Sequence, residues 1–175
     1  RGAFKTLSNF DNPLFLKIET DGIDDKDVRI ADFTIDGATV TGTGTHLGIL
    51  ANVVASTNLP GAQTIEIDHL NIINSSVTYS GTGFWSVGGL IGFVDWITNT
   101  PDPNEDFFLR EIYSTADVIT TNNTNSQYIG GLIGQLKGHP SRNIALEYNF
   151  VGIEKNGNDY NFDDANEAIQ INSGT

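Results

Sequence analysis

Apolar and polar residues alternate along short segments of this chain in the two-residue rhythm of β-strands. Ile65 and Ile67, and then Leu70 and Ile72, are separated by polar residues, as expected for a strand with one buried face. The alternation shifts phase between Ile67 and Leu70, which predicts a bend or bulge. Helical periodicity is almost absent, and the best helical candidate is the short segment Asp163–Ile169. The pattern predicts an all-β protein.

One stretch of sequence recurs. The pentapeptide Gly-Gly-Leu-Ile-Gly stands at Gly88–Gly92 and again at Gly130–Gly134, which is 42 residues later (130 − 88). Strand-like segments precede both copies, and a more divergent copy ends at His46–Ala51. A fixed period of this length predicts one supersecondary unit that is stacked on copies of itself.

The paired glycines need a physical reason, because glycine normally weakens a strand. A recurring pair indicates tight backbone packing or a sharp corner where a Cβ would clash. Aligning Gly48 with the second glycine of each pair predicts an interior column of the two leucines, with Ile49 beneath them. The residues expected to recur structurally are Gly88, Gly89, Leu90, Gly92, Gly130, Gly131, Leu132 and Gly134.

These motifs resemble those of the GLUG-repeat proteins, whose short motif is Gly-Gly-Leu followed by an aliphatic residue and Gly. Val87–Gly92 and Ile129–Gly134 fit it throughout, and Leu47–Ala51 fits it loosely. The resemblance covers roughly residues 28–150 and implies a β-solenoid of the right-handed β-helix type, here with about three to four coils. It also implies a secreted or surface-attached bacterial protein, such as an adhesin. The motif is structural and implies no catalytic residue.

This pattern divides the chain into three parts. We expect solenoid units over residues 28–153, an N-terminal cap or pairing segment over 1–27, and a C-terminal tail or cap over 154–175. The chain begins at Arg1 and contains no methionine, so we expect it to be a processed product or a segment of a longer surface protein.

Charge narrows the classes of partner. The chain has 22 acidic and 9 basic residues, for a net charge of −13. Nucleic acids are bound by neutralising phosphates with Lys and Arg, and anionic membranes attract the same side chains, so neither partner is expected. There is no cysteine and no apolar stretch long enough to span a membrane. An extracellular location without disulfides fits this composition.

Calcium is the one cofactor that the sequence offers, because acidic loops supply the oxygen ligands it prefers. Asp21, Asp24 and Asp25 crowd one loop. Asp159, Asn161 and Asp163 have the spacing of the first three ligands of an EF-hand, but the later positions of that loop do not match. The alternative is that both segments are solvated acidic turns, with no cofactor bound.

Four aromatic residues near the first pentapeptide are candidates for sugar binding. Exposed aromatic faces beside polar groups are how proteins hold neutral sugars. The candidates are Trp85, Trp96, Phe93 and Tyr128. The alternative is that these rings cover the edges of the core.

Catalytic signals are weak. Ser86 lacks the flanking glycine of a nucleophile elbow, and His46 and His69 are isolated from each other. Only Arg110, Lys137 and Arg142 could gather basic charge for a polysaccharide-degrading β-helix. We therefore expect no catalytic residue. The predicted function is a structural or adhesive segment that contacts copies of itself or neighbouring domains, and the alternative is a carbohydrate-binding or polysaccharide-degrading domain.

Overall fold

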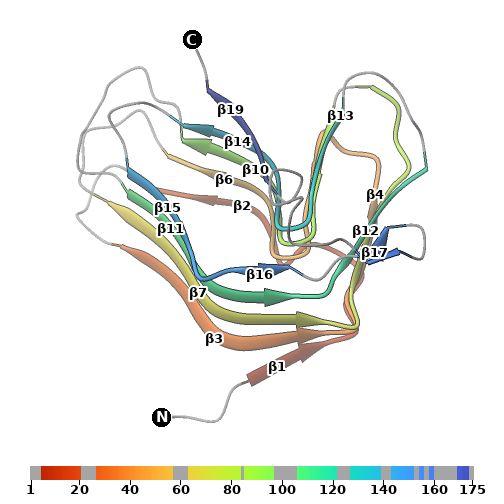
Figure 1. Cartoon of the computed structure of the whole chain (residues 1–175), viewed down its shortest axis with the longest axis horizontal. Coiled ribbons are helices and arrows are strands. Elements are labelled where there is room, and N and C mark those ends of the chain that lie inside the picture. The colour runs from red at the N-terminus through yellow and green to blue at the C-terminus, as the bar shows by residue number, and fades with distance from the viewer. Residues whose placement is uncertain are drawn as a thin grey trace.

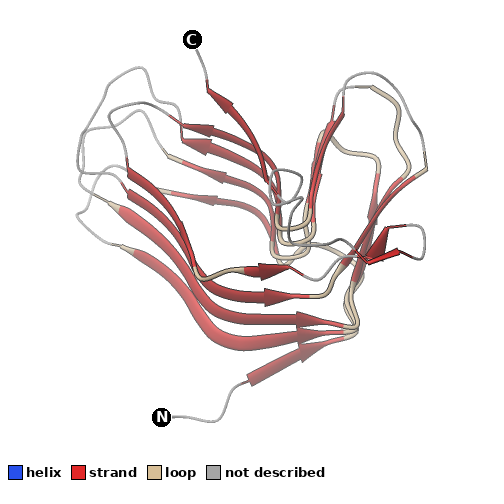
Figure 2. Cartoon of the chain, in the orientation of Figure 1, coloured by secondary structure: helices blue, strands red, loops and turns tan. Residues whose placement is uncertain are grey.

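The structure is a computed structural model, and it describes residues 5–20, 27–56, 63–83, 85–96, 106–121, 127–138, 143–151, 154–155, 158–159 and 169–173. Every regular element in these ranges is a β-strand (Figure 2). The predicted all-β class is therefore confirmed. The short helical candidate Asp163–Ile169 lies outside the described residues, except that Ile169 begins a strand.

Four parallel sheets make up the fold. Sheet I contains β1 (Lys5–Ser8), β3 (Val28–Asp36), β7 (Thr64–Ile73), β11 (Asp106–Ser114), β15 (Asn143–Glu147) and β16 (Phe150–Val151). Sheet II contains β4 (Thr39–Gly42), β8 (Ser76–Tyr79) and β12 (Asp117–Thr120), and sheet III contains β5 (His46–Leu47), β9 (Trp85–Gly88) and β13 (Gln127–Gly130). Sheet IV contains β2 (Phe15–Glu19), β6 (Ala51–Ala55), β10 (Ile91–Trp96), β14 (Ile133–Gly138) and β19 (Ile169–Ser173). A separate antiparallel pair is formed by β17 (Glu154–Lys155) and β18 (Asn158–Asp159).

The chain visits sheets I, II, III and IV in this order and then returns to sheet I. We call one such circuit a pass. Three passes are complete, namely β3–β6, β7–β10 and β11–β14, and an incomplete pass lies on either side of them. Strands of successive passes lie side by side, with the N terminus at one end of the stack and the C terminus at the other (Figure 1).

The core consists of columns of apolar side chains that run through the stack. In sheet I, Ile30, Ile67 and Leu109 occupy equivalent positions in successive passes. In sheet IV the register aligns Val54 with Val94 and with Leu136 in the same way. The alternation within each strand sends these residues inward, so each pass adds one layer to a single hydrophobic core.

Sheets III and IV meet at a sharp corner that the pentapeptide forms (Figure 1). A Cβ on Gly92 would lie against the backbone of Leu47 and 2.8 Å from the carbonyl oxygen of Asn52. A Cβ on Gly88 would lie 2.6 Å from the amide nitrogen of Gly134. Side chains at these positions would therefore collide with main-chain atoms. The prediction that the glycines mark tight backbone packing is confirmed.

The predicted alignment of the divergent copy was wrong by one residue. Leu47 pairs with Val87, which sets Gly48 beside the first glycine of the pentapeptide and not the second. Leu50, not Ile49, lies beneath Leu90, and its amide nitrogen donates to the Leu90 carbonyl oxygen at 2.9 Å. The buried leucine at the corner is the common feature of the copies, because its side chain fills the interior of every pass.

The sheets extend past the expected boundaries at residues 28 and 153. β1 pairs with β3, and β2 pairs with β6, so the N-terminal segment forms part of the first pass. β19 pairs with β14 and adds a fifth strand to sheet IV.

Candidate functional site

Sheet I bends at the same position in each of four passes. The backbone there has positive φ at Asp32, His69, Glu111 and Tyr148, and the strand pairings align these four residues in one column. We call them the bend column. In β7 the burial pattern changes phase here, since Asp68 is buried and the next residue is exposed. The sequence predicted a bend or a bulge in this strand, and the structure shows a bend, because the strand register continues unbroken through it.

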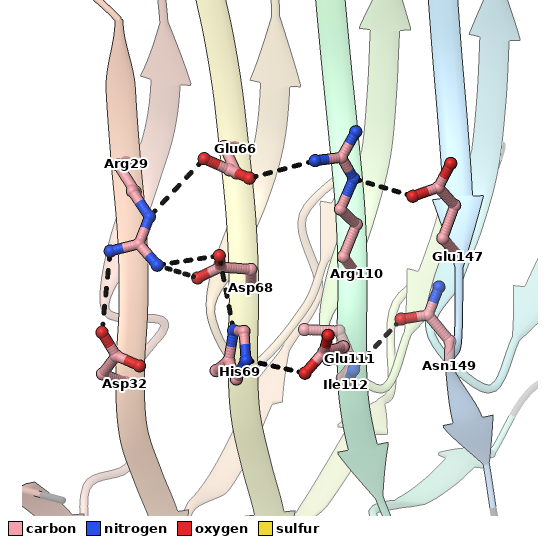
Figure 3. Close-up of polar contacts among 10 residues, drawn as sticks. All are labelled: Arg29, Asp32, Glu66, Asp68, His69, Arg110, Glu111, Ile112, Glu147 and Asn149. Atoms are coloured by element: carbon pink, nitrogen blue, oxygen red, sulfur yellow. Dashed lines mark hydrogen bonds and ion pairs between the residues drawn. The ribbon is translucent and has the colours of Figure 1, made fainter.

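Charged side chains pair between passes beside the bend column, on the outer face of sheet I (Figure 3). The guanidinium of Arg29 donates to both carboxylate oxygens of Asp68, at 2.9 and 2.8 Å, and its Nε lies 3.5 Å from Glu66. Arg110 lies between two carboxylates, 3.3 Å from Glu66 and 3.0 Å from Glu147. We call these five residues the ion-pair ladder, and it joins four successive passes.

Asp68 is the ladder residue most removed from solvent, with 8% of its side chain exposed. A carboxylate in that position needs partners, because burial disfavours its charge. The hydrogen bond from Arg29 and the attraction between the two charges supply them, and they raise the pKa of Arg29 above its ordinary value. His69 lies on the other side, with Nδ1 3.4 Å from Asp68 and Nε2 2.7 Å from Glu111. The bend and the ladder therefore form one polar network.

An open hollow of about 500 Å³ adjoins this network at its C-terminal end and is lined by Glu111, Ile112, Tyr113 and Tyr148. Both tyrosines are exposed. The side chain of Asn149 fixes the chain here. Its Nδ2 donates to the carbonyl oxygen of Leu109 at 3.0 Å, and its Oδ1 accepts from the backbone amide nitrogen of Ile112 at 3.1 Å. The hollow therefore combines aromatic surface with a carboxylate on a restrained backbone.

A second polar cluster lies where sheets III and IV meet. His46 Nδ1 and Ser86 Oγ are joined by a hydrogen bond of 2.7 Å, and the ring of His46 stacks on Phe93 with the centroids 4.6 Å apart. Lys137 Nζ lies 5.2 Å from the centroid of the same Phe93 ring. Ser86 is fully buried, so its hydroxyl cannot reach a substrate in solution. These contacts pack sheet III against sheet IV.

The pKa of His46 should lie below its ordinary value of about 6.5. Burial is the main cause, the charge of Lys137 adds to it, and Asp95 opposes it. Below pH 6.5 the unfolded chain then binds more protons than the folded chain, so the free energy of unfolding falls as the solution is acidified. NMR titration of the imidazole should give a midpoint below 6.5, and Lys137→Met should raise it. A wild-type midpoint at or above 6.5 would contradict the assignment.

The structure corrects the sugar-binding prediction for three of the four aromatic candidates. Trp85 and Trp96 are fully buried, and Phe93 is covered by His46. Trp85 stacks on Tyr79, and Trp96 packs near Phe107. Because these three rings are buried, they cannot offer a face to a sugar. They serve packing, as the alternative interpretation held. Tyr128 is half-buried in β13.

Comparisons with protein families, with curated proteins and with solved structures found no match to this chain. The resemblance to the GLUG-repeat proteins therefore stays a prediction. In the part of the chain that the structure describes, no helix is long and apolar enough to cross a membrane.

The calcium prediction falls almost entirely outside the described residues. Asp21, Asp24, Asp25, Asn161 and Asp163 all lie there, and Asp159 is described only as part of the backbone of β18. Among the side chains that are described, no group of three His, Cys, Asp or Glu residues could hold a metal ion.

The two described basic residues that were considered for a degradative enzyme lie in different sheets. Arg110 lies in sheet I, Lys137 lies in sheet IV, and Arg142 is outside the described residues. Sequence reasoning missed Tyr113 and Tyr148 as candidates. The change of alternation between Ile67 and Leu70 could have identified Tyr148. The same bend recurs in later units, and Tyr148 occupies the exposed position at that bend.

Proposed function

We propose that this chain is a non-catalytic structural segment of an extracellular surface protein, a right-handed β-solenoid that stacks end to end on further copies of itself. Parallel strands joined by a crossover are right-handed in about 98% of cases, which supports that winding. The acidic surface and the motif shared with surface proteins support the location.

The observation that carries this proposal is how the core columns end. Leu7 aligns with the buried Ile35, yet it is 40% exposed because β1 is the first strand of its sheet. Phe15 aligns with the buried Ala51 and is 41% exposed in β2. At the opposite end Ile129 continues a buried column and is 41% exposed. Among the described residues, no further strand of the same sheet pairs over any of these three positions.

Strand edges and charges favour the same contact. In the described part of the chain, β1 and β2 are edge strands at one end, and β12 and β13 are edge strands at the other. Edge strands present backbone donors and acceptors that can pair with another chain. The ion-pair ladder begins at Arg29 and ends at Glu147, so the facing ends of two stacked copies carry opposite charges. A head-to-tail contact of this kind does not close on itself and produces a filament.

We expect purified protein to associate with rising concentration. Phe15→Lys should block one end and Ile129→Lys the other, so each variant alone should remain monomeric in sedimentation velocity. In an equal mixture, the unblocked end of one variant can pair with the unblocked end of the other. The resulting dimer has only blocked ends, so association should stop there. Thr78→Lys, in the middle strand of sheet II, is the matched control.

A wild-type chain that stays monomeric at millimolar concentration while keeping its β-sheet circular dichroism would refute end-to-end stacking. Association that neither end variant weakens would also refute it, because the contact would then lie on a lateral face.

A further inference from the structure

We propose that the hollow beside the bend column binds a neutral sugar ring, which contacts both Tyr113 and Tyr148 and donates hydroxyl hydrogen bonds to Glu111. This goes beyond the structural role proposed above, and it rests on a lateral surface and not on the ends of the core columns. It would make the segment adhesive.

Tyr148 occupies a position where its side chain contributes little to folding. Its backbone φ is +55°, a conformation that is unfavourable for a bulky residue. In the three preceding passes the bend column holds Asp32, His69 and Glu111, all of them polar. Tyr148 is 85% exposed, so packing does not compensate for the strain. A ligand that uses the ring would account for it.

Tyr113 is likewise a tyrosine in a column that holds polar residues in the earlier passes. Thr6, Thr34 and Asn71 occupy the equivalent positions of the earlier passes. In the next pass Tyr113 occupies this position, and 43% of its surface is exposed. Two columns of polar residues thus change to tyrosine in successive passes, and both rings line the hollow. Exposed aromatic rings with a carboxylate nearby are suited to the apolar faces and hydroxyl groups of sugars.

The site is organised before any ligand arrives. Asn149 holds the backbone on both sides of the bend through Leu109 and Ile112, and His69 holds the carboxylate of Glu111. Because these groups are already fixed, binding requires little further ordering.

Local charge selects among sugars. The polar network that adjoins the hollow contains five carboxylates and two guanidinium groups, a surplus of three negative charges (5 − 2). An acidic polysaccharide would be repelled, whereas a neutral one is not, and its hydroxyl groups can donate to the carboxylate. The residues that supply these charges are Asp32, Glu66, Asp68, Glu111, Glu147, Arg29 and Arg110.

The proposal is tested by NMR titration of the full chain with neutral cello-, manno- and chito-oligosaccharides, with polygalacturonate as the acidic probe and spermidine as the cationic probe. We expect at least one neutral series to bind, and Tyr148→Ala and Tyr113→Ala each to weaken binding by about 10-fold. Ile119→Ala removes an exposed apolar side chain of sheet II and should leave binding unchanged. Glu111→Gln replaces a charged acceptor with a neutral one and should weaken the binding of the neutral sugar.

No binding of any neutral series at millimolar concentration would overturn the proposal. Binding that both tyrosine variants retain would overturn it too, since the sugar would then sit elsewhere. Spermidine binding that Glu111→Gln abolishes, without sugar binding, would show a cation site instead. A monomeric protein that binds sugar would refute stacking alone, and a filament that binds none would refute only the sugar site.

Discussion

Replacing Gly92 with alanine is expected to destabilise the protein by about 3 kcal/mol or more, because the added methyl group meets backbone that cannot move aside. The nearest atoms belong to the main chain of Leu47, whose carbonyl carbon would lie 2.9 Å from the new Cβ, and of Asn52. Leu47 is itself held in β5, so relief would separate sheets III and IV. Urea unfolding followed by the fluorescence of the two buried tryptophans measures the change.

Gly44 provides the matched control. A Cβ placed there has its nearest neighbour, the carbonyl oxygen of His46, at 4.0 Å. Gly44→Ala should therefore change the free energy of unfolding by no more than about 0.5 kcal/mol. Equal midpoints for Gly92→Ala and the wild type would show that the two sheets do not approach closely at this corner.

The sequence contains enough information to predict the strands and the corner. Alternation specifies which residues of β7 face inward, and the pentapeptide marks a place where side chains cannot fit. It is harder to predict which residues of neighbouring strands pair, because the passes differ in length. Val28 pairs with Ile65, whereas Thr64 pairs with Asp106. A single period of 42 residues cannot supply both pairings.

The ion-pair ladder depends on that register and could not be predicted. Arg29 and Asp68 meet because their strands pair with this offset. A shift of one residue would send one of the two side chains to the opposite face of the sheet. Loop lengths set the offset between paired strands. The loop sequences do not indicate which charged residues will face one another.

The tryptophans show a different limit of sequence reasoning. A strand with one buried face reveals its orientation by alternation, but all four residues of β9 are buried. One face packs into the core, and the other meets sheet IV, where Ser86 contacts His46 beside Phe93. Without alternation, the sequence cannot tell a ring in the core from one at the surface.

Trp85→Ala is expected to lower the free energy of unfolding by about 3–5 kcal/mol, because it removes a large, fully buried side chain and leaves a cavity. The lost contacts include the ring of Tyr79, whose centroid lies 4.3 Å away. Trp85→Phe should cost less than about 1.5 kcal/mol, since it keeps an aromatic ring there. Among the described residues, the indole Nε1 has no hydrogen-bond partner that the substitution would remove. Urea unfolding followed by circular dichroism compares the three proteins.

Tyr148→Ala is the control for this pair, because it removes an aromatic ring from the surface. Its stability should stay within about 0.5 kcal/mol of the wild type. The two positions thus separate packing from recognition: Trp85 should affect folding, and Tyr148 should affect sugar binding. A Trp85→Ala protein with unchanged stability and lost sugar binding would reverse these roles, and it would mean that the indole faces solvent and not the core.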